Sequence, residues 1–256
     1  MLKVATWNVN SIRTRLSQLA EWLNKEQPDI VGLQELKLSD HEFPNEALNE
    51  LGYKSVYLGQ KSYNGVAILS KEDPKETITG IPGFEDSQAR VIATTVGAVR
   101  FLSIYAPNGQ ALDSDKYQYK LEWFTHLKNY LTGILIEYPN TIVVGDFNVA
   151  PEDRDVHNPA AWRDSVLVSP AERTAFFQLL ELGLIDTFRL FDQAHAAYTW
   201  WDYRNLGFER NHGLRIDHIL ANTNLALSCG HSWVDLAPRK NERPSDHAPV
   251  VSEFYI

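Results

Sequence analysis

The chain has 256 residues, of which 44% are hydrophobic and 22% are charged, as is usual for a soluble globular protein. Its net charge of −9 argues against a nucleic-acid partner, because such proteins usually carry a basic surface. A local positive field at a cleft can nevertheless oppose the overall charge. No run of about 18 apolar residues exists, so we expect no membrane span.

Other global features point to one intracellular domain. The single cysteine, Cys229, excludes an internal disulfide and fits a reducing compartment. Strand-like residues begin at Leu2 in place of a basic and apolar leader, so we expect no signal peptide. Without a repeat or linker, residues 1–256 are predicted to form one domain. The basic residues that could build a local positive patch, or belong to a mixed-charge surface, are Arg13, Arg15, Lys37, Lys61, Arg90, Lys116, Lys120, Arg204, Arg210, Arg239, Lys240 and Arg243.

Hydrophobic periodicity predicts strands interleaved with a few helices. Strands are expected at residues 2–7, 29–34, 54–58, 65–70, 90–96, 99–105, 141–145, 198–200, 215–221, 232–236 and 249–255. Helices are expected from Ile12 to Leu23, over residues 44–51 with Gly52 as the C′ residue, along Tyr117 to Leu131, and after the capping box Ser169-Pro170-Ala171-Glu172. This order indicates a mixed sheet core with helices outside.

Polar residues flank four predicted strands: they follow three of them and precede the last one. Ligand sites gather at such sheet edges. These polar residues are Asn8 and Asn10, Glu35 and Lys37, Asp146 and Asn148, and Asp246 and His247. Asp146 and Asn148 lie two residues apart, so an extended backbone would point both side chains the same way. Each group also has a simpler interpretation: a helix cap at Asn8 or Asn10, a surface ion pair of Glu35 with Lys37, and an Asx-turn at Asp146 and Asn148.

These residue types suit hydrolysis of a phosphate ester. Carboxylate and amide oxygens are the ligands that Mg²⁺ prefers, which favours Glu35 as a ligand with Asp246 and Asn8 as helpers. Hydrolysis also needs a base and a donor to the phosphoryl oxygens. Asp146 suits the base and Asn148 can hold water or phosphate. His247 can donate if Asp217 orients its ring.

The same residues carry a family resemblance that spans essentially the whole chain. The chain resembles the exonuclease III–type apurinic/apyrimidinic endonucleases, within the endonuclease/exonuclease/phosphatase superfamily, in motifs that occur in the expected order. These are Thr6-Trp7-Asn8-Val9-Asn10, Leu33-Gln34-Glu35-Leu36-Lys37, Tyr63-Asn64-Gly65-Val66-Ala67, Tyr105-Ala106-Pro107-Asn108, Gly145-Asp146-Phe147-Asn148, Tyr198-Thr199-Trp200-Trp201, Leu214-Arg215-Ile216-Asp217 and Ser245-Asp246-His247.

This resemblance implies a fold and a set of roles. The fold would be an α/β (α+β), four-layer αββα sandwich of two packed mixed β-sheets flanked by helices. Glu35 would be the principal ligand of Mg²⁺ (with Mn²⁺ as a substitute), supported by Asn8 and Asp246, while Asp146 would activate or position water. Asn148, Tyr105, and the dyad of Asp217 and His247 would complete the catalytic set. Lys37, Asn108, Trp200, Leu214 and Ile216 would contact the substrate, the last three at a pocket for a base-less sugar, although aromatics there could equally be core.

The implied activity is a Mg²⁺-dependent DNA-repair phosphodiesterase acting on duplex DNA. It would incise 5′ to abasic sites, degrade DNA from 3′ ends, or remove 3′-phosphates, as a monomer in the cytoplasm and associated with the nucleoid. A 3′-end enzyme with weak or no abasic-site incision is the alternative. A phosphatase or phospholipase of the superfamily and a catalytically inactive nucleic-acid-associated regulator are further alternatives, and the second predicts loss of Glu35 or Asp146.

The sequence departs from the family pattern in two places. Val166, Leu167 and Val168, within residues 160–169, are bulky where some family members are smaller. They either pack against the sheet or narrow the sugar pocket, which would favour 3′-end processing. Leu214 stands where an aromatic residue is common, which would loosen a pocket wall.

Overall fold

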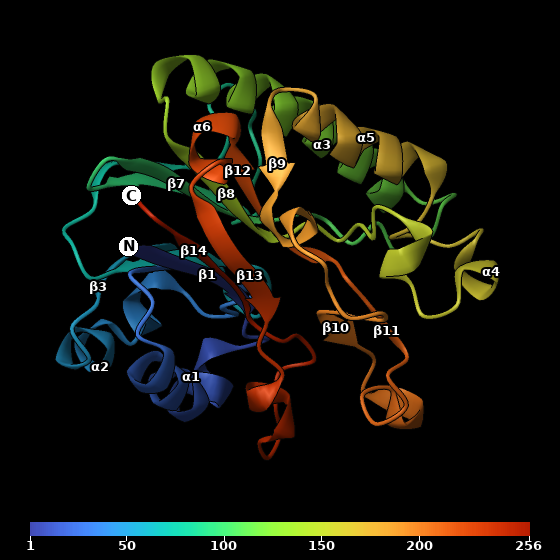
Figure 1. Ribbon diagram of the computed structural model, residues 1–256, viewed down its shortest axis with the longest axis horizontal. Coiled ribbons are helices and arrows are strands. Elements are labelled where there is room, and N and C mark those ends of the chain that lie inside the picture. Colours follow the sequence, from blue (N-terminus) through green and yellow to red (C-terminus); the bar gives the residue numbers. More distant parts are fainter.

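Two six-stranded sheets stacked face to face form the centre of the computed structural model, which describes residues 1–256 (Figure 1). The first sheet has the order β13-β14-β1-β2-β4-β3 and the second β5-β6-β7-β8-β12-β9, while β10 and β11 pair apart from both. The strand bounds are β1 Leu2–Asn8, β2 Ile30–Gln34, β3 Lys54–Leu58, β4 Val66–Ser70, β5 Lys75–Thr79, β6 Val91–Val96, β7 Val99–Tyr105, β8 Thr141–Asp146, β9 Leu184–Asp186, β10 Trp200–Trp201, β11 Gly213–Leu214, β12 Asp217–Asn222, β13 Cys229–Val234 and β14 Val250–Phe254.

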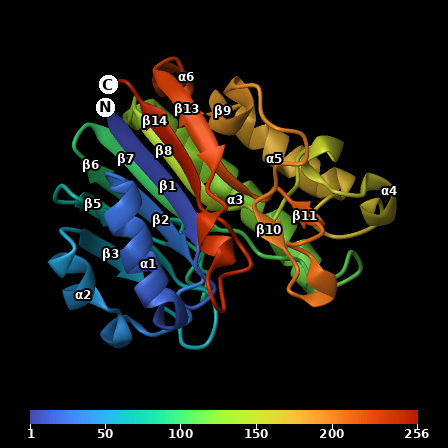
Figure 2. The same cartoon turned by 60° about the horizontal axis from the view of Figure 1, so that its bottom comes forward.

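Helices cover the outer face of each sheet. Their bounds are α1 Ile12–Glu26, α2 Asn45–Glu50, α3 Asp115–Glu137, α4 Pro159–Trp162, α5 Pro170–Leu180 and α6 Thr223–Ala226. Each sheet is mixed, because β1 runs parallel to β2 and β7 parallel to β8 while their other neighbours are antiparallel. The predicted mixed, four-layer α/β sandwich is therefore confirmed, and Figure 2 shows α1 running along the outside of the first sheet.

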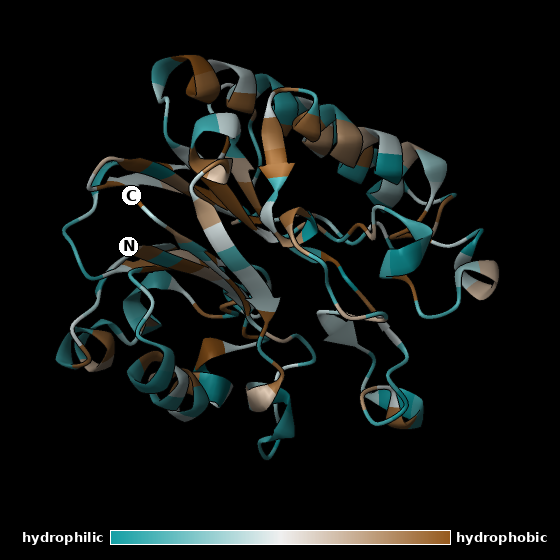
Figure 3. Cartoon of the chain, in the orientation of Figure 1, coloured by the Kyte–Doolittle hydropathy of each residue, from teal (hydrophilic) through white to brown (hydrophobic).

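Three hydrophobic clusters separate the four layers. Trp22 and Leu23 of α1 pack on one face of the first sheet, and Trp123 and Phe124 of α3 pack on the far face of the second. Between the sheets lies a third cluster, to which β8 contributes Ile142 and Val144. Every residue of β8 is buried, as its unbroken apolar run predicted. Figure 3 shows that the strands carry most of the hydrophobic colour and the loops most of the hydrophilic.

Local signals predicted the starts of α1 and α5, whereas α1 and α3 extend past their predicted ends at Leu23 and Leu131, and the short helices α4 and α6 were not predicted. Ser169 and Glu172 form the predicted capping box at the start of α5. The cap of α1, however, is Ser11, whose side chain accepts from the Thr14 N–H. Neither Asn8 nor Asn10 caps this helix, so both amides are free for other partners.

The strands that the sequence pattern missed or misplaced lie at sheet edges. β5 exposes all five residues and β9 has only three, so neither has an apolar pattern to detect. β13 begins and ends earlier than the predicted 232–236, and β10 is shifted to Trp200–Trp201. Edge strands are weakly specified by sequence because only one side of each is paired. None of the helices combines the length and hydrophobicity that a bilayer crossing requires.

Candidate active site

Five strands bring their polar ends together at one edge of the sandwich. Asn8 ends β1, Glu35 follows β2 and Asp146 ends β8, while Asp217 begins β12 and His247 precedes β14. Asp146 is paired in register with Tyr105 on one side and with Asp217 on the other. Residues that are far apart in sequence thus meet at one end of the two sheets, where Glu35 is half-buried and Asn8, Asp146, Asp217 and His247 are buried.

Gly145 allows β8 to deliver Asp146 to this edge. Its φ is +152°, and a Cβ atom there would lie 1.9 Å from the carbonyl oxygen of Ile104 on β7. A side chain at this position would push the two strands apart. The glycine that precedes the acidic residue is therefore required by packing.

Asn8 joins the acidic residues of the two sheets. Its Nδ2 donates to Glu35 Oε1 at 2.9 Å and to Asp146 Oδ2 at 3.0 Å, while its Oδ1 accepts from the Asn10 N–H. Ligand atoms of Glu35, Asp146 and His247 all lie within 4.8 Å of one another. This acidic and histidine group is a candidate metal site, to which Asn8 presents its NH₂ group and not its oxygen.

His247 is held by a carboxylate on each side. Its Nδ1 lies 2.8 Å from Asp217 Oδ2, and its Nε2 lies 3.7 Å from Asp146 Oδ2. Burial opposes a charge on the ring, but Asp217 and Asp146 outweigh this and raise the pKa of His247 to about 10. The ring is therefore an imidazolium with one N–H directed toward Asp146.

Asp146 lies in a crowd of negative charge. Burial, the Asp217 carboxylate and the Glu35 carboxylate raise the pKa of Asp146 to about 7, against the opposing effects of His247 and Asn8. A carboxylate with this pKa can accept a proton near neutral pH. The same excess of negative charge is a physical reason for a cation to bind beside it.

Asn148 does not continue an extended strand. β8 ends at Asp146, and Asn148 has a left-handed φ of +50°, so the predicted common direction of the two side chains is wrong. The Asn148 N–H donates to Asp146 Oδ1 at 2.9 Å, as in an Asx-turn, and its Nδ2 donates to the Ala106 carbonyl. Asn108 Nδ2 approaches Asn148 Oδ1 at 3.4 Å. Asp146 and Asn148 therefore form an Asx-turn and also belong to the candidate site, so these two interpretations do not exclude each other.

Tyr105 and Lys37 both lie beside Glu35. Burial, then the Glu35 and Asp146 carboxylates, raise the pKa of Tyr105 well above its usual value, so the phenol is neutral. Lys37 Nζ lies 2.9 Å from Glu35 Oε2 and donates to Asn10 Oδ1 at 2.5 Å. The predicted Glu35–Lys37 ion pair exists, and it forms the rim of the acidic group.

Asp246 is not one of the three residues of the candidate metal site. Its Oδ1 accepts from Asn10 Nδ2 at 2.9 Å and its Oδ2 from Trp200 Nε1 at 3.0 Å. In this arrangement Asp246 orients Trp200 and Asn10, and both of its carboxylate oxygens are occupied by these two partners. Asn10 stood in a predicted motif, but its role as the link between Asp246 and Lys37 needed the structure.

The expected sugar pocket is only partly open. Trp200 is half-buried, whereas Leu214 and Ile216 are buried in a small cluster together with Leu167 and Val168. Leu214 has no exposed surface and Ile216 only 2%, so neither touches a ligand in this conformation. As a correction to the expected contact role, both support Trp200 from behind. Leu167 and Val168 are buried in this separate cluster, and half-buried Val166 packs against it.

Thr199 is a positioning residue that sequence reasoning missed, although it lies within the motif at 198–201. Its Oγ1 accepts from the N–H groups of Ile216 and Asp217 at 3.0 and 3.1 Å. It thereby fixes the backbone that carries Asp217. The second Asp217 oxygen, Oδ1, is buried without a partner.

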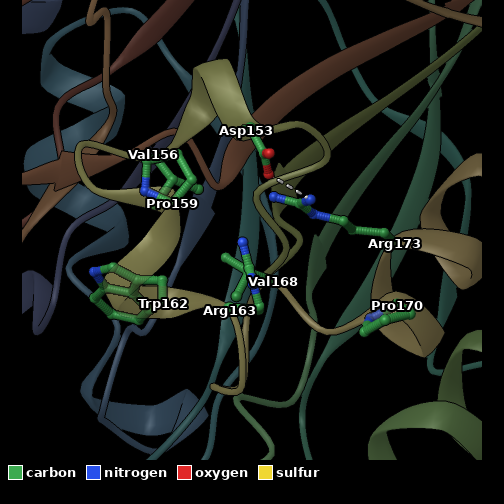
Figure 4. Close-up of a pocket in the computed structure, with 8 residues that line it drawn as sticks. All are labelled: Asp153, Val156, Pro159, Trp162, Arg163, Val168, Pro170 and Arg173. Atoms are coloured by element: carbon green, nitrogen blue, oxygen red, sulfur yellow. Dashed lines mark hydrogen bonds and ion pairs between the residues drawn. The ribbon is translucent and has the colours of Figure 1, made fainter.

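A separate hollow of about 320 Å³ opens beside α4 (Figure 4). Trp162 and Val156 form one side, and Arg173 forms an ion pair with Asp153 at 2.8 Å on the other. None of its lining residues belongs to the acidic group. The hollow therefore lies near Trp200 and is not the candidate active site.

Behind the site, Arg215 is fully buried between two carboxylates. It donates to Asp155 Oδ1 and to Asp186 Oδ2, each at 2.7 Å. Burial opposes ionisation of Asp186, but Arg215 and His218 outweigh it and hold the pKa of this carboxyl below its usual range. Its contribution to stability is thus present above about pH 4, the value of an unfolded aspartate, and is lost as the pH falls further.

Asp186→Asn should therefore lower the free energy of unfolding by about 3–5 kcal/mol at pH 7, because Arg215 loses one buried partner. The difference from the wild type should shrink below about pH 4. Urea denaturation at pH 7 and pH 3 measures both. Asp202→Asn, which breaks the exposed pair with Arg204, is the matched control and should cost less than about 1 kcal/mol. A difference that does not depend on pH would contradict the expectation.

The family model described as "Endonuclease/Exonuclease/phosphatase family" matches residues 5–247 of the chain. The chain belongs to this family. Among relatives, exodeoxyribonuclease III of Haemophilus influenzae is 37% identical, with 99% of this chain and 100% of that protein covered. The DNA repair nuclease APEX1 of Danio rerio is 32% identical over 98% of this chain and 81% of its own length.

Solved structures of family members agree with this chain over its whole length. A 3′–5′ exonuclease from Neisseria meningitidis has a TM-score of 0.98 at 45% identity, and both chains are fully covered. A 3′ phosphatase from Neisseria bound to a product DNA hairpin gives the same values. An AP endonuclease from Archaeoglobus fulgidus has a TM-score of 0.97 at 40% identity, again with full coverage. The endonuclease/exonuclease/phosphatase family resemblance seen in the motifs is confirmed.

Proposed function

We propose that this protein is a DNA-repair phosphodiesterase that hydrolyses phosphoester bonds in duplex DNA with the help of Mg²⁺ or Mn²⁺. The observation that carries the proposal is the convergence of Glu35, Asp146 and the Asp217–His247 dyad where strands of both sheets end. Full-length likeness to enzymes named for exonuclease, 3′-phosphatase and AP endonuclease activity supports DNA as the substrate. Both acidic residues that an inactive regulator would lack are present.

The residues at the site suit a divalent cation. Three carboxylates meet there, and burial together with Asp217 and Glu35 raises the pKa of Asp146, so the group carries more negative charge than His247 neutralises. We propose that Glu35 is the principal ligand of the ion, because Mg²⁺ prefers carboxylate oxygens, and that Asp146 lies beside the ion with its carboxylate left for the attacking water. When bound, the ion would neutralise charge on the phosphoryl oxygens.

The protein groups then have separate tasks. Asp146 accepts a proton from the attacking water, and the Asn148 N–H bond to Asp146 Oδ1 fixes the direction of this carboxylate. The His247 imidazolium donates to a phosphoryl oxygen, and Asp217 fixes the ring through Nδ1. Tyr105, neutral and beside Glu35, donates to phosphate, while Lys37 at the rim attracts the DNA backbone.

The direct test uses labelled duplexes that carry a tetrahydrofuran abasic analogue, a 3′-phosphate or a plain recessed 3′ end. We expect cleavage of at least one of them with Mg²⁺ and no cleavage in EDTA, because the acidic group then repels the DNA phosphate. Adding Mg²⁺ or Mn²⁺ in excess of EDTA should restore turnover, and Ca²⁺ with the same charge is the control for simple screening. No turnover on any duplex with either metal would refute the proposal.

A 3′-end enzyme with weak abasic-site incision is the second candidate, and the segment beside Trp200 favours it. Val166 is half-buried and packs against the same cluster as Trp200, so we propose that its side chain limits the space for an abasic sugar. Val166→Ala should raise the ratio of abasic-site incision to 3′-phosphate removal by about tenfold, the usual scale for a change of one or two methyl groups. Val56→Ala, a half-buried valine on β3 that belongs to a different cluster, is the control and should leave the ratio unchanged. If the ratio is unchanged in both variants, the proposal that the Val166 side chain limits the space for the sugar is contradicted.

We further propose that residues 1–256 act as one domain and as a monomer. Both sheets contribute to the acidic group, Glu35 from the first and Asp146 from the second, so neither sheet would be active alone.

A further inference from the structure

Arg90 is a buried cation without a carboxylate partner. Only 8% of it is exposed, and its guanidinium donates to neutral acceptors: Nε and Nη2 to Gln88 Oε1 at 3.0 and 2.7 Å, and Nη1 to the Tyr105 carbonyl at 3.0 Å. Burying a charge that no opposite charge compensates is unfavourable. An ion pair therefore does not explain the burial of this charge.

Arg90 contacts Tyr105 in three ways. Its carbonyl accepts from the Tyr105 N–H at 2.8 Å, its Nη1 binds the Tyr105 carbonyl, and its guanidinium carbon lies 4.9 Å from the centre of the phenol ring. A guanidinium over an aromatic face at this distance is attracted to the ring. The backbone and the ring of Tyr105 are thus held by the same side chain.

The network extends from Arg90 to the loop that carries Lys37. Gln88 Oε1 also accepts from Asn64 Nδ2 at 3.3 Å, and the Asn64 carbonyl accepts from the Lys37 N–H at 3.0 Å. Two residues of the proposed phosphate site, from different sheets, are therefore linked through one guanidinium. The fork geometry of arginine permits these simultaneous bonds, which a lysine could not make.

We propose that Arg90 is a positioning residue for phosphoester cleavage, which acts by holding the Tyr105 phenol in place beside Glu35. This rests on the proposed function, since it assigns Tyr105 a contact with the substrate. Arg90 itself is directed at Tyr105 and Gln88. Its effect on turnover passes through the Tyr105 hydroxyl.

The chain supplies a matched control in Arg100. This residue is also buried, also lies over a tyrosine ring, that of Tyr138 at 4.8 Å, and also donates to a backbone carbonyl, that of Glu76. It lies on β7 like Tyr105, but at the opposite end of that strand from the acidic group. Arg100→Met therefore reproduces the loss of packing and of charge without touching the site.

The first experiment is a double-mutant cycle on kcat with the duplex that the wild type cleaves best. Arg90→Met should lower kcat by roughly 10- to 100-fold, as expected for a misplaced catalytic group, and Arg100→Met should leave kcat unchanged. In a Tyr105→Phe background, Arg90→Met should add less than about a twofold loss, because the hydroxyl it positions is already absent. An equal loss in both backgrounds, or a loss with Arg100→Met, would overturn the proposal.

A second measurement does not depend on DNA cleavage. With ¹³C-labelled tyrosine, the NMR signal of Tyr105 is the one that disappears in Tyr105→Phe. Arg90→Met should shift that signal and leave Tyr138 in place, while Arg100→Met should do the reverse. If Arg90→Met does not fold, Arg90→Lys keeps a charge near the ring without the fork and should shift the same signal. An unmoved Tyr105 signal overturns the inference even if the wild type cleaves DNA, whereas absent cleavage with a shifted signal refutes only the proposed function.

Discussion

Asp146→Asn is expected to lower kcat for DNA cleavage by about 10²- to 10⁴-fold, the range associated with loss of a positioned acid or base. The substitution keeps the shape of the side chain, removes its charge and replaces one of its two acceptor oxygens by an NH₂ group. Because burial, Asp217 and Glu35 raise the pKa of Asp146 to about 7, the ionised carboxylate is unfavourable in the folded protein. In EDTA at pH 8 the variant should therefore melt at a higher temperature than the wild type.

The combination of slower turnover and greater stability separates a functional carboxylate from a structural one. Single-turnover cleavage and thermal denaturation, on the same samples, measure the two. Asp186→Asn is the control with the opposite sign, since that buried carboxylate is stabilised by Arg215 and its loss should lower stability. An Asp146→Asn variant that is both less stable and fully active would remove Asp146 from the proposed mechanism.

Asp217→Asn is expected to lower kcat by roughly 10²-fold or more, although Asp217 lies behind His247 and does not reach the substrate. The Asp217 and Asp146 carboxylates overcome the effect of burial and raise the pKa of His247 to about 10. Removing one of these charges lowers that pKa, so less of the ring is protonated as the pH rises. The loss in kcat should therefore be larger at pH 9 than at pH 6.

A double-mutant cycle checks this dependence. In a His247→Ala background, Asp217→Asn should cause little further loss, because the ring that it orients is gone. A pH-independent loss that persists without His247 would show that Asp217 acts through the fold. Asn222→Ala at the far end of β12 is the control and should leave kcat unchanged.

The sequence predicted the secondary structure of the core better than that of the sheet edges. The buried strand β8 and the capping box at Ser169 were predicted correctly, because burial on both faces and a local hydrogen-bond pattern leave direct marks in the sequence. The exposed strand β5 and the short β9 leave none, since their pairing depends on neighbours that are distant along the chain. Lys75–Thr79 has no apolar alternation at all.

At the site, sequence identified the participants better than their geometry. Asp217 and His247 were paired correctly from chemistry alone. The direction of Asn148 was wrong, because a left-handed turn at the strand end replaces the extended backbone that spacing assumed. Asp246 was expected at the metal, yet its oxygens are occupied by Asn10 and Trp200. Asp246, Asn10 and Trp200 come from three separate segments of the chain, so no local sequence pattern indicates that they are in contact.

By itself, the sequence determined the layered α/β fold, the family and the set of residues available for phosphoester chemistry, because periodicity and motifs are local properties of the chain. Only the tertiary structure decided which of these residues meet. It joined Asn8 to both Glu35 and Asp146, buried Leu214 and Ile216 behind Trp200, and placed Arg90 over Tyr105. The physical reason is that side-chain contacts and charge effects depend on distances between strands and loops, which are set only when the two sheets pack.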